Sequence, residues 1–150
     1  MRNLIGLKPQ DVLILLKLMV SPALNQKKLA QCLDISSAEV SHGFRRLKNS
    51  KLLTVNNGVN KETSSEFLIH ALKYMFPPQL GTIAVGIPTA YARPGFSFVR
   101  YSSDDIYIWP HPEGTVKGIA LKPIYPSLPS ACLQDEKLYK IGRASCRERV

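Results

Sequence analysis

The first half of the chain has the hydrophobic periodicity of helices. In four stretches, apolar residues recur every three or four positions, which is the spacing of one helix face. We therefore predict helices over residues 9–20, 26–33, 37–49 and 61–76. The first of these is apolar on most of its sides, so it is expected to lie centrally in the core.

The stretch 26–53 predicts two short helices joined by a tight turn. The apolar stripe of the first helix consists of Leu29, Ala30 and Leu33. The stripe of the second helix consists of Val40, Phe44 and Leu47. Residues 34–36 form the turn between them. Two helices joined by about three or four residues are the helix-turn-helix of DNA-binding proteins.

Polar residues at the ends of these helices support the predicted limits. Asn25 and Ser36 are good N-caps, because their side-chain oxygens can accept a hydrogen bond from an amide of the first turn. Glu39 follows Ser36 at the spacing of a capping box. Gly43 lies inside the second helix, where it costs roughly 1 kcal/mol relative to alanine. We therefore expect another helix to approach closely at Gly43.

The face opposite the apolar stripe of the 37–49 helix carries side chains that could read DNA bases. At 100° per residue this face consists of Ala38, His42, Arg45 and Asn49, flanked by Arg46. Arg45 could donate two hydrogen bonds to guanine, and Asn49 could pair with adenine. His42 could contact a base or a phosphate. In a helix-turn-helix, this outer face is the one presented to the major groove.

Side chains suited to phosphate contacts surround that face. They are Ser36, Ser37, Ser41, Lys48 and Lys51. Such contacts position a protein on the duplex without specifying its sequence. The alternative for each of these residues is a solvated polar surface. DNA binding is the better explanation for the set, because the base-reading and the phosphate-type side chains fall in different sectors of the helix.

The positive charge of the chain is concentrated on the same part. The formal net charge is +9 over 150 residues. Residues 1–60 contribute +6, residues 61–140 only +1, and the last ten residues +2. A basic surface favours a polyanionic partner, because neutralised phosphates release condensed counterions. Double-stranded DNA is therefore the predicted partner.

A stunted hairpin or a loop is expected after the second helix. Residues 52–55 predict a short strand and residues 56–58 a turn. There is little room for a long wing, because Asn60 can already cap the 61–76 helix. In that helix His70 and Tyr74 lie beside the apolar stripe and are expected to be packed in the core.

The composition changes after residue 78. With the pair at 77 and 78, the segment up to 140 holds nine of the eleven prolines. It predicts short extended pieces at 82–88, 106–109 and 115–121, a turn at 111–114, and a helix that begins near Asp135. Its aromatic residues argue against disorder. The predicted fold class is mainly α with small β: a winged helix-turn-helix-like domain over 1–78, with an irregular Pro/Gly-rich extension over 79–139 packing on it.

The cysteines and the N-terminus predict a cytoplasmic protein. Three cysteines without a CxxC pair favour a reducing compartment. The apolar run 12–20 contains Lys17 and has no small-residue cleavage site, so it is not a signal peptide. It is also shorter than the roughly 20 apolar residues that a membrane-spanning helix needs.

No catalytic or cofactor motif is present. The chain has neither a P-loop nor the GxGxxG of dinucleotide-binding proteins. Its histidines, His42, His70 and His111, lack Cys, His or Asp partners at metal-ligand spacing. We therefore expect no enzymatic activity, no metal and no cofactor.

The last eleven residues form a separate segment. Lys140–Val150, with the sequence KIGRASCRERV, resembles the in-frame translation of a common sequencing-adapter oligonucleotide. This resemblance implies that the natural chain is interrupted near Tyr139. Residues 140–150 would then be a non-native tail whose arginines and Cys146 carry no biological role. A natural oligomerisation helix could follow the interruption.

Residues 9–55 resemble the DNA-binding part of bacterial winged helix-turn-helix regulators, especially the MarR type. The residues that carry the resemblance are Leu29, Ala30, Leu33, Ile35, Ser36, Val40, Ser41 and Leu47. The resemblance implies a transcriptional regulator with residues 36–49 as its recognition segment, and a possible homodimer. The alternative is a winged helix used for protein interaction, as in an antitoxin-like or replication-associated complex.

Overall fold

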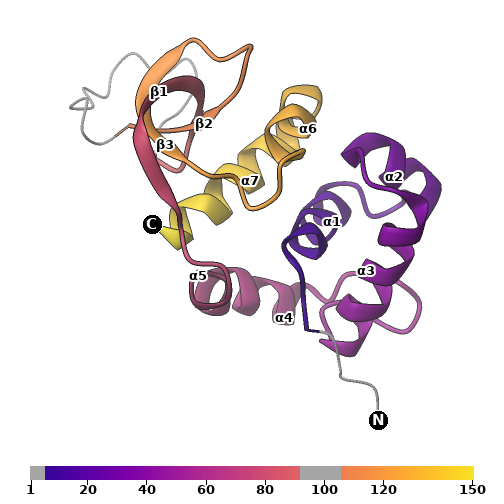
Figure 1. Ribbon diagram of the computed structural model, residues 1–150. Coiled ribbons are helices and arrows are strands. Elements are labelled where there is room, and N and C mark those ends of the chain that lie inside the picture. Colours follow the sequence, from indigo (N-terminus) through magenta and orange to yellow (C-terminus); the bar gives the residue numbers. More distant parts are fainter. Residues whose placement is uncertain (1–5, 92–105) are drawn as a thin grey trace. The chain divides into compact units, whose positions relative to one another are not determined.

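The protein is mainly helical with one small three-stranded sheet, which confirms the predicted fold class at that level (Figure 1). The computed structural model describes residues 6–91 and 106–150. Contacts divide the chain into two compact units, Met1–Phe67 and Leu68–Val150. The boundary that we predicted, after residue 78, lies later in the chain than this division after Phe67.

The first unit is built on three helices whose limits match the sequence prediction. They are α1 Pro9–Val20, α2 Gln26–Leu33 and α3 Ser37–Asn49. Asn25 caps α2 by accepting a hydrogen bond from the Lys28 amide at 2.9 Å. Ser36 caps α3 by accepting one from the Glu39 amide at 3.2 Å. Local capping chemistry therefore sets where these helices begin.

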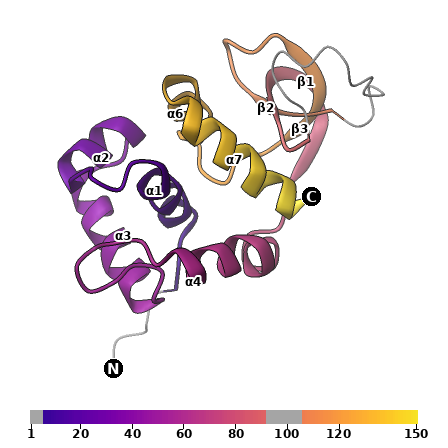
Figure 2. The same cartoon turned by 180° about the vertical axis from the view of Figure 1, so that it is seen from behind.

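The three helices pack against one another around a common apolar core (Figures 1 and 2). The stripes predicted for α2 and α3 are buried, and so is most of α1. The innermost side chains of this core are Leu13, Ile14, Leu15, Leu16, Leu29, Leu33, Val40 and Leu47. Between α2 and α3, Asp34 has a left-handed backbone with φ 52°, which ends α2 so that α3 can start after a short turn.

The hairpin after α3 is short, as expected. A single antiparallel bridge joins Leu53 to Val59. The Thr54 amide donates to the Gly58 carbonyl at 2.7 Å, and the Asn60 amide donates to the Leu52 carbonyl at 3.0 Å. Asn60 also caps the next helix by accepting from the Thr63 amide at 3.3 Å.

The helix predicted over 61–76 contains a π-helical insertion. It consists of α4 Lys61–Glu66, the π-helix η1 Phe67–Ala71 and α5 Leu72–Met75. The prediction that His70 and Tyr74 are packed is wrong, because both are exposed, Tyr74 to 78%. The wider turns of a π-helix change which residues share a face, so a period of 3.6 residues misplaces the side chains that follow.

The strands of the second unit lie where the sequence predicted extended pieces. They are β1 Leu80–Thr89, β2 Tyr107–Pro110 and β3 Val116–Leu121. β3 pairs antiparallel with the first part of β1 and β2 with its last part, and the two pairings meet at Gly86. β2 and β3 also pair in parallel, which closes a small barrel. A Cβ atom at Gly86 would lie 2.0 Å from the Trp109 carbonyl oxygen, so only glycine fits there.

Two helices complete the second unit, α6 Leu128–Gln134 and α7 Glu136–Arg149. The sequence did not predict α6, whose Pro129 occupies the first turn, where proline is tolerated. The start of α7 was predicted, and Asp135 caps it by accepting from the Lys137 and Leu138 amides. Most of residues 140–150 continue α7, whose Gly142 packs close to α6. The adapter origin of this segment stays a prediction.

Candidate nucleic-acid interface

The outer face of α3 is exposed where the sequence predicted it. Ala38, His42, Arg45 and Asn49 are all exposed, and so is Ser41 on the adjoining sector. Ser36 and Ser37 at the start of the helix and Lys51 just after its end are exposed as well, and Lys48 is half-buried. Nine of the ten predicted residues therefore have at least partial access to solvent, and the tenth, Arg46, does not.

The prediction that Arg46 flanks the DNA-facing surface is wrong. Arg46 is buried, with 7% of its surface exposed, and it faces α1. Its Nε donates to Asp11 Oδ2 at 2.7 Å and its Nη2 to Asp11 Oδ1 at 2.9 Å. These hydrogen bonds raise the pKa of the Arg46 guanidinium. The helical period places Arg46 beside the outer face of α3. This side of α3 is buried because α1 packs against it.

Asp11 is fully buried and accepts a third hydrogen bond. The Lys8 amide donates to Asp11 Oδ2 at 2.8 Å, so the same carboxylate caps α1 and binds α3. A buried carboxylate with three donors has most of its hydrogen-bonding capacity satisfied. Sequence reasoning missed this residue. Its signal was an acidic side chain directly before the mostly apolar stretch 12–20.

Glu39, the one acidic residue of α3, also faces α1. Its carboxylate accepts a hydrogen bond from Gln10 Nε2, which is the main reason that the pKa of Glu39 is lowered. The predicted capping box is therefore half formed: Ser36 accepts from the Glu39 amide, while the Glu39 carboxylate binds Gln10. The outer face of α3 itself carries no acidic side chain, and the partly exposed Glu39 carboxylate beside it interacts electrostatically with His42.

Gly43 is the point of closest approach between α1 and α3. A Cβ atom there would lie 2.7 Å from Ile14 Cδ1 and 2.9 Å from Asp11 Oδ1. Both distances are shorter than ordinary van der Waals contacts. The close approach of a helix that the sequence predicted at Gly43 is confirmed.

Lys51 stands in a backbone position that usually belongs to glycine. Its φ is 64°, in the left-handed region, directly after α3. The Leu52 amide donates to the Leu47 carbonyl and the Lys51 amide to the Lys48 carbonyl, both at 3.0 Å, which is the pattern of a Schellman motif. A long cationic side chain is thus held at the end of α3 at a conformational cost that glycine would avoid.

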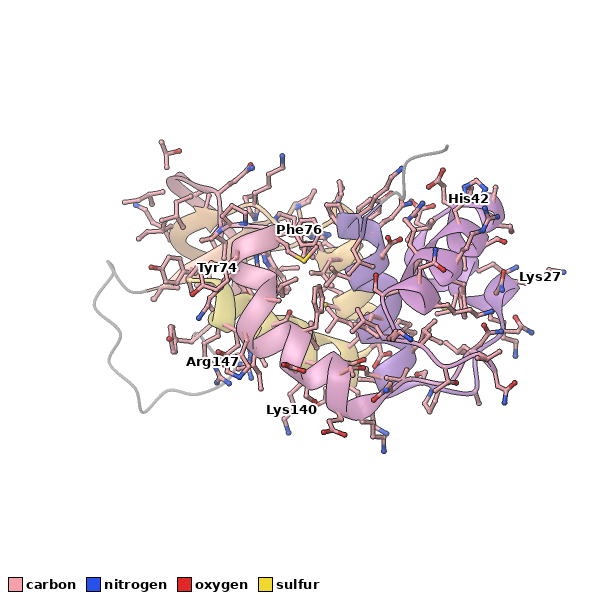
Figure 3. The ribbon with its side chains drawn as sticks, turned by 90° about the horizontal axis from the view of Figure 1, so that it is seen from below. Lys27, His42, Tyr74, Phe76, Lys140 and Arg147 are labelled. Atoms are coloured by element: carbon pink, nitrogen blue, oxygen red, sulfur yellow. The ribbon has the colours of Figure 1, made fainter. Side chains whose placement is uncertain are left out.

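The helix before the turn adds positive charge that the sequence prediction did not include in the site. Lys27 and Lys28 are both exposed in the first turn of α2. Figure 3 shows Lys27 and His42 at the outer side of α2 and α3, pointing away from the ribbon. The two lysines therefore extend the exposed positive charge from α3 to the start of α2. Their charge and position in the 26–33 helix were visible in the sequence.

The second unit holds a small open hollow between the barrel and α7. Ile87, Pro88, Glu113, Leu133 and Tyr139 are among the residues that line it. The Tyr139 hydroxyl donates to the Pro88 carbonyl, and burial raises its pKa to about 12. In the residues that the structure describes, no three His, Cys, Asp or Glu side chains gather as metal ligands. Nor does any helix among them have the length and apolarity to cross a bilayer.

Comparisons of the whole chain found no match to a protein-family model, to a curated protein or to a solved structure. The features that bear on function are therefore those of α3 and its neighbours. α3 is a helix with a cationic outer face, free of acidic side chains and held against α1 by a buried ion pair.

Proposed function

We propose that this protein binds double-stranded DNA sequence-specifically by inserting α3 into the major groove, as a helix-turn-helix regulator of transcription in the bacterial cytoplasm. The observation that carries the proposal is the division of polar side chains on α3. Those that can read bases or bind phosphates point to solvent, while Glu39 and Arg46 are engaged by α1.

The base-reading roles fall on three exposed residues. Arg45 is placed to donate two hydrogen bonds to a guanine, and Asn49, one turn further, to pair with an adenine. His42 lies about one turn before Arg45 and about two turns before Asn49 on the same face, and contacts a base or a phosphate. Ala38 leaves room near the start of α3 and can contact a thymine methyl group.

Phosphate contacts come from both ends of α3. Ser36, Ser37 and Ser41 offer hydroxyl groups near its N-terminus, and Lys48 and Lys51 offer ammonium groups near its C-terminus. The lysines Lys27 and Lys28 of α2 extend this cationic surface. A single unit of this size binds weakly, so a homodimer on two half-sites is part of the proposal.

Binding of fluorescent duplex DNA at increasing salt tests the proposal. A steep fall in affinity with salt is expected, with a slope that reflects the number of phosphates contacted. Lys51→Ala should reduce that slope by about one. A binding constant that does not respond to salt, or no binding to duplex DNA at low salt, contradicts the proposal.

A second candidate function is protein interaction, which the surface of β1 favours. Leu80, Ile83 and Val85 are exposed to 57%, 61% and 52%, and residues 79–91 contain no charged side chain. Exposed apolar side chains on a strand are a common feature of interaction surfaces. Loss of a copurifying partner in Ile83→Lys, with unchanged DNA binding, would support this function beside the first.

A further inference from the structure

The contact between α1 and α3 includes side-chain hydrogen bonds and an ion pair in addition to apolar packing. Among the residues of α3 that meet α1 are Glu39, Gly43 and Arg46. They are spaced at i, i+4 and i+7, so they form one stripe along the helix. Opposite them, Gln10 and Asp11 are adjacent residues in the first turn of α1.

We propose that Gln10 and Asp11 set the rotation of α3 about its own axis, and thereby determine which bases its outer face can read. In this role Glu39 and Arg46 are positioning residues that do not touch DNA. The inference deepens the proposed function and depends on it. It concerns sequence discrimination, which is a narrower property than binding.

The two polar contacts restrain rotation because both lie on one stripe of α3, away from its axis, and their spacing along the helix restrains its tilt as well. Glu39 and Arg46 are seven residues apart, which corresponds to about 10 Å along a helix axis. Each hydrogen bond joins a side chain of α3 to a fixed point on α1. A rotation of α3 in either direction would stretch both contacts, whereas an apolar stripe alone tolerates small rotations.

The bidentate geometry at Arg46 makes this restraint directional. Two donors of one planar guanidinium meet the two oxygens of Asp11, at 2.7 Å and 2.9 Å. Such pairs specify an orientation, which a single point charge such as lysine does not. The Lys8 amide also donates to Asp11 Oδ2, which restrains the orientation of the acceptor carboxylate.

Gly43 brings the helices close enough for these contacts to form. A Cβ atom there would meet Ile14 Cδ1 and Asp11 Oδ1 at less than 3 Å, so any other residue would displace these buried side chains or the helix itself. The small separation between α1 and α3 at Gly43 therefore contributes to the restraint on the rotation of α3.

Base reading requires this precision. The ends of side chains lie about 5–6 Å from a helix axis, so a rotation of about 20° moves them by about 2 Å. Hydrogen bonds to base edges tolerate only a few tenths of an ångström around about 2.9 Å. A small rotation would thus abolish base contacts of Arg45 and Asn49, while long lysines could still reach phosphates.

The test compares binding to two duplexes. A preferred duplex is selected from a random pool with the wild-type protein, and a scrambled duplex of the same composition serves as the reference. Arg46→Lys keeps the positive charge and removes the bidentate contact. We expect its preference for the selected duplex over the scrambled one to fall about tenfold or more, with affinity for the scrambled duplex unchanged. Glu39→Gln should lower the preference less.

A matched control separates positioning from stability. Leu29→Val shortens a fully buried side chain of α2 and leaves Gln10, Asp11, Glu39 and Arg46 intact. Its melting temperature is measured beside that of Arg46→Lys, and its preference should stay at the wild-type value.

The outcomes separate the two proposals. An unchanged preference in Arg46→Lys, or an equal loss in Leu29→Val, overturns the positioning role and leaves the proposed function standing. A wild-type protein that prefers no duplex overturns both. If Arg46→Lys does not fold, Glu39→Gln decides: an unchanged preference there overturns the positioning role, and a reduced preference supports it.

Discussion

Arg45 and Arg46 are neighbours in the sequence, and they belong to opposite regions of α3. Arg45 is exposed on the outer face, and Arg46 is buried in an ion pair with Asp11. Two identical side chains therefore lie in different environments: Arg45 is accessible to solvent, and Arg46 holds α3 against α1. Charge on a predicted recognition helix cannot all be counted as DNA-binding charge, because an adjacent helix can neutralise part of it.

The largest expected effect is on stability, in Arg46→Ala. The change leaves the Asp11 carboxylate buried without its partner, and breaking a buried ion pair in this way costs about 3–5 kcal/mol. Denaturant unfolding of the protein should show this loss. The matched change Arg45→Ala should alter the free energy of unfolding by no more than about 0.5 kcal/mol. Equal effects of the two changes would remove the distinction between the two faces.

The next effect is on DNA affinity, in Arg45→Ala. Loss of a bidentate contact with guanine should weaken binding to a selected duplex by about 1–3 kcal/mol, with little change for scrambled DNA. Fluorescence anisotropy with both duplexes measures this difference. A double change of Arg45 and Arg46 would be uninformative, because Arg46→Ala weakens the fold.

Gly43→Ala should destabilise the protein although alanine is the better helix former. The new methyl group would meet Ile14 Cδ1 and Asp11 Oδ1, and overpacking of this kind costs about 1–3 kcal/mol. Ser41→Ala, on the exposed sector of the same helix, is the control. It should change the free energy of unfolding by no more than about 0.5 kcal/mol. A Gly43→Ala protein more stable than wild type would show that the α1–α3 contact is looser than described.

Lys51→Gly should have opposite effects on stability and on DNA affinity. Removing the side chain relieves the left-handed backbone and should stabilise the protein by about 1 kcal/mol. The same change removes the proposed phosphate contact of Lys51, so DNA affinity should fall and the salt slope should decrease by about one. Thermal unfolding and salt titration measure the two effects. If Lys51→Gly leaves DNA binding unchanged, Lys51 does not contact a phosphate.

The smallest effect is on pH dependence. The pKa of Glu39 is lowered from 4.5 by its hydrogen bond with Gln10, so its contribution to stability is present above about pH 4.5 and is lost as pH falls through the lower folded pKa. The pKa of Arg46 is raised from 12.5, so its contribution is lost only at still higher pH. Urea unfolding of Glu39→Gln between about pH 3 and 6 should therefore show a weaker pH dependence than wild type. The same slope in both proteins would mean that Glu39 is not held by Gln10.

Much of the first unit could be predicted from sequence because its signals are local. Asn25 and Ser36 cap the helices that follow them, and the apolar stripes of α2 and α3 repeat at helical spacing. Gly43 was informative because glycine inside a helix is costly unless something lies close. These features depend on residues within a turn or two of one another.

The α1–α3 contact could not be predicted, because it joins residues far apart in the sequence. Asp11 and Arg46 are separated by 35 positions, and the helical wheel, which places Arg46 beside the outer face, does not tell whether another helix covers it. The π-helical insertion at Phe67–Ala71 is similarly invisible to a regular helical period, and it turned His70 and Tyr74 outward. In the second unit the strands were predictable, but their closure into a barrel around Gly86 depends on long-range pairing.

The most direct measurement is the ratio of dissociation constants for a selected and a scrambled duplex, determined for the wild-type protein and for Arg45→Ala. We expect the wild-type protein to bind the selected duplex more tightly than the scrambled one. In Arg45→Ala the ratio of the two dissociation constants should fall by about tenfold or more, while the protein remains folded. Equal affinity of wild type for the two duplexes, or an unchanged preference in Arg45→Ala, would contradict the claim that the outer face of α3 reads DNA.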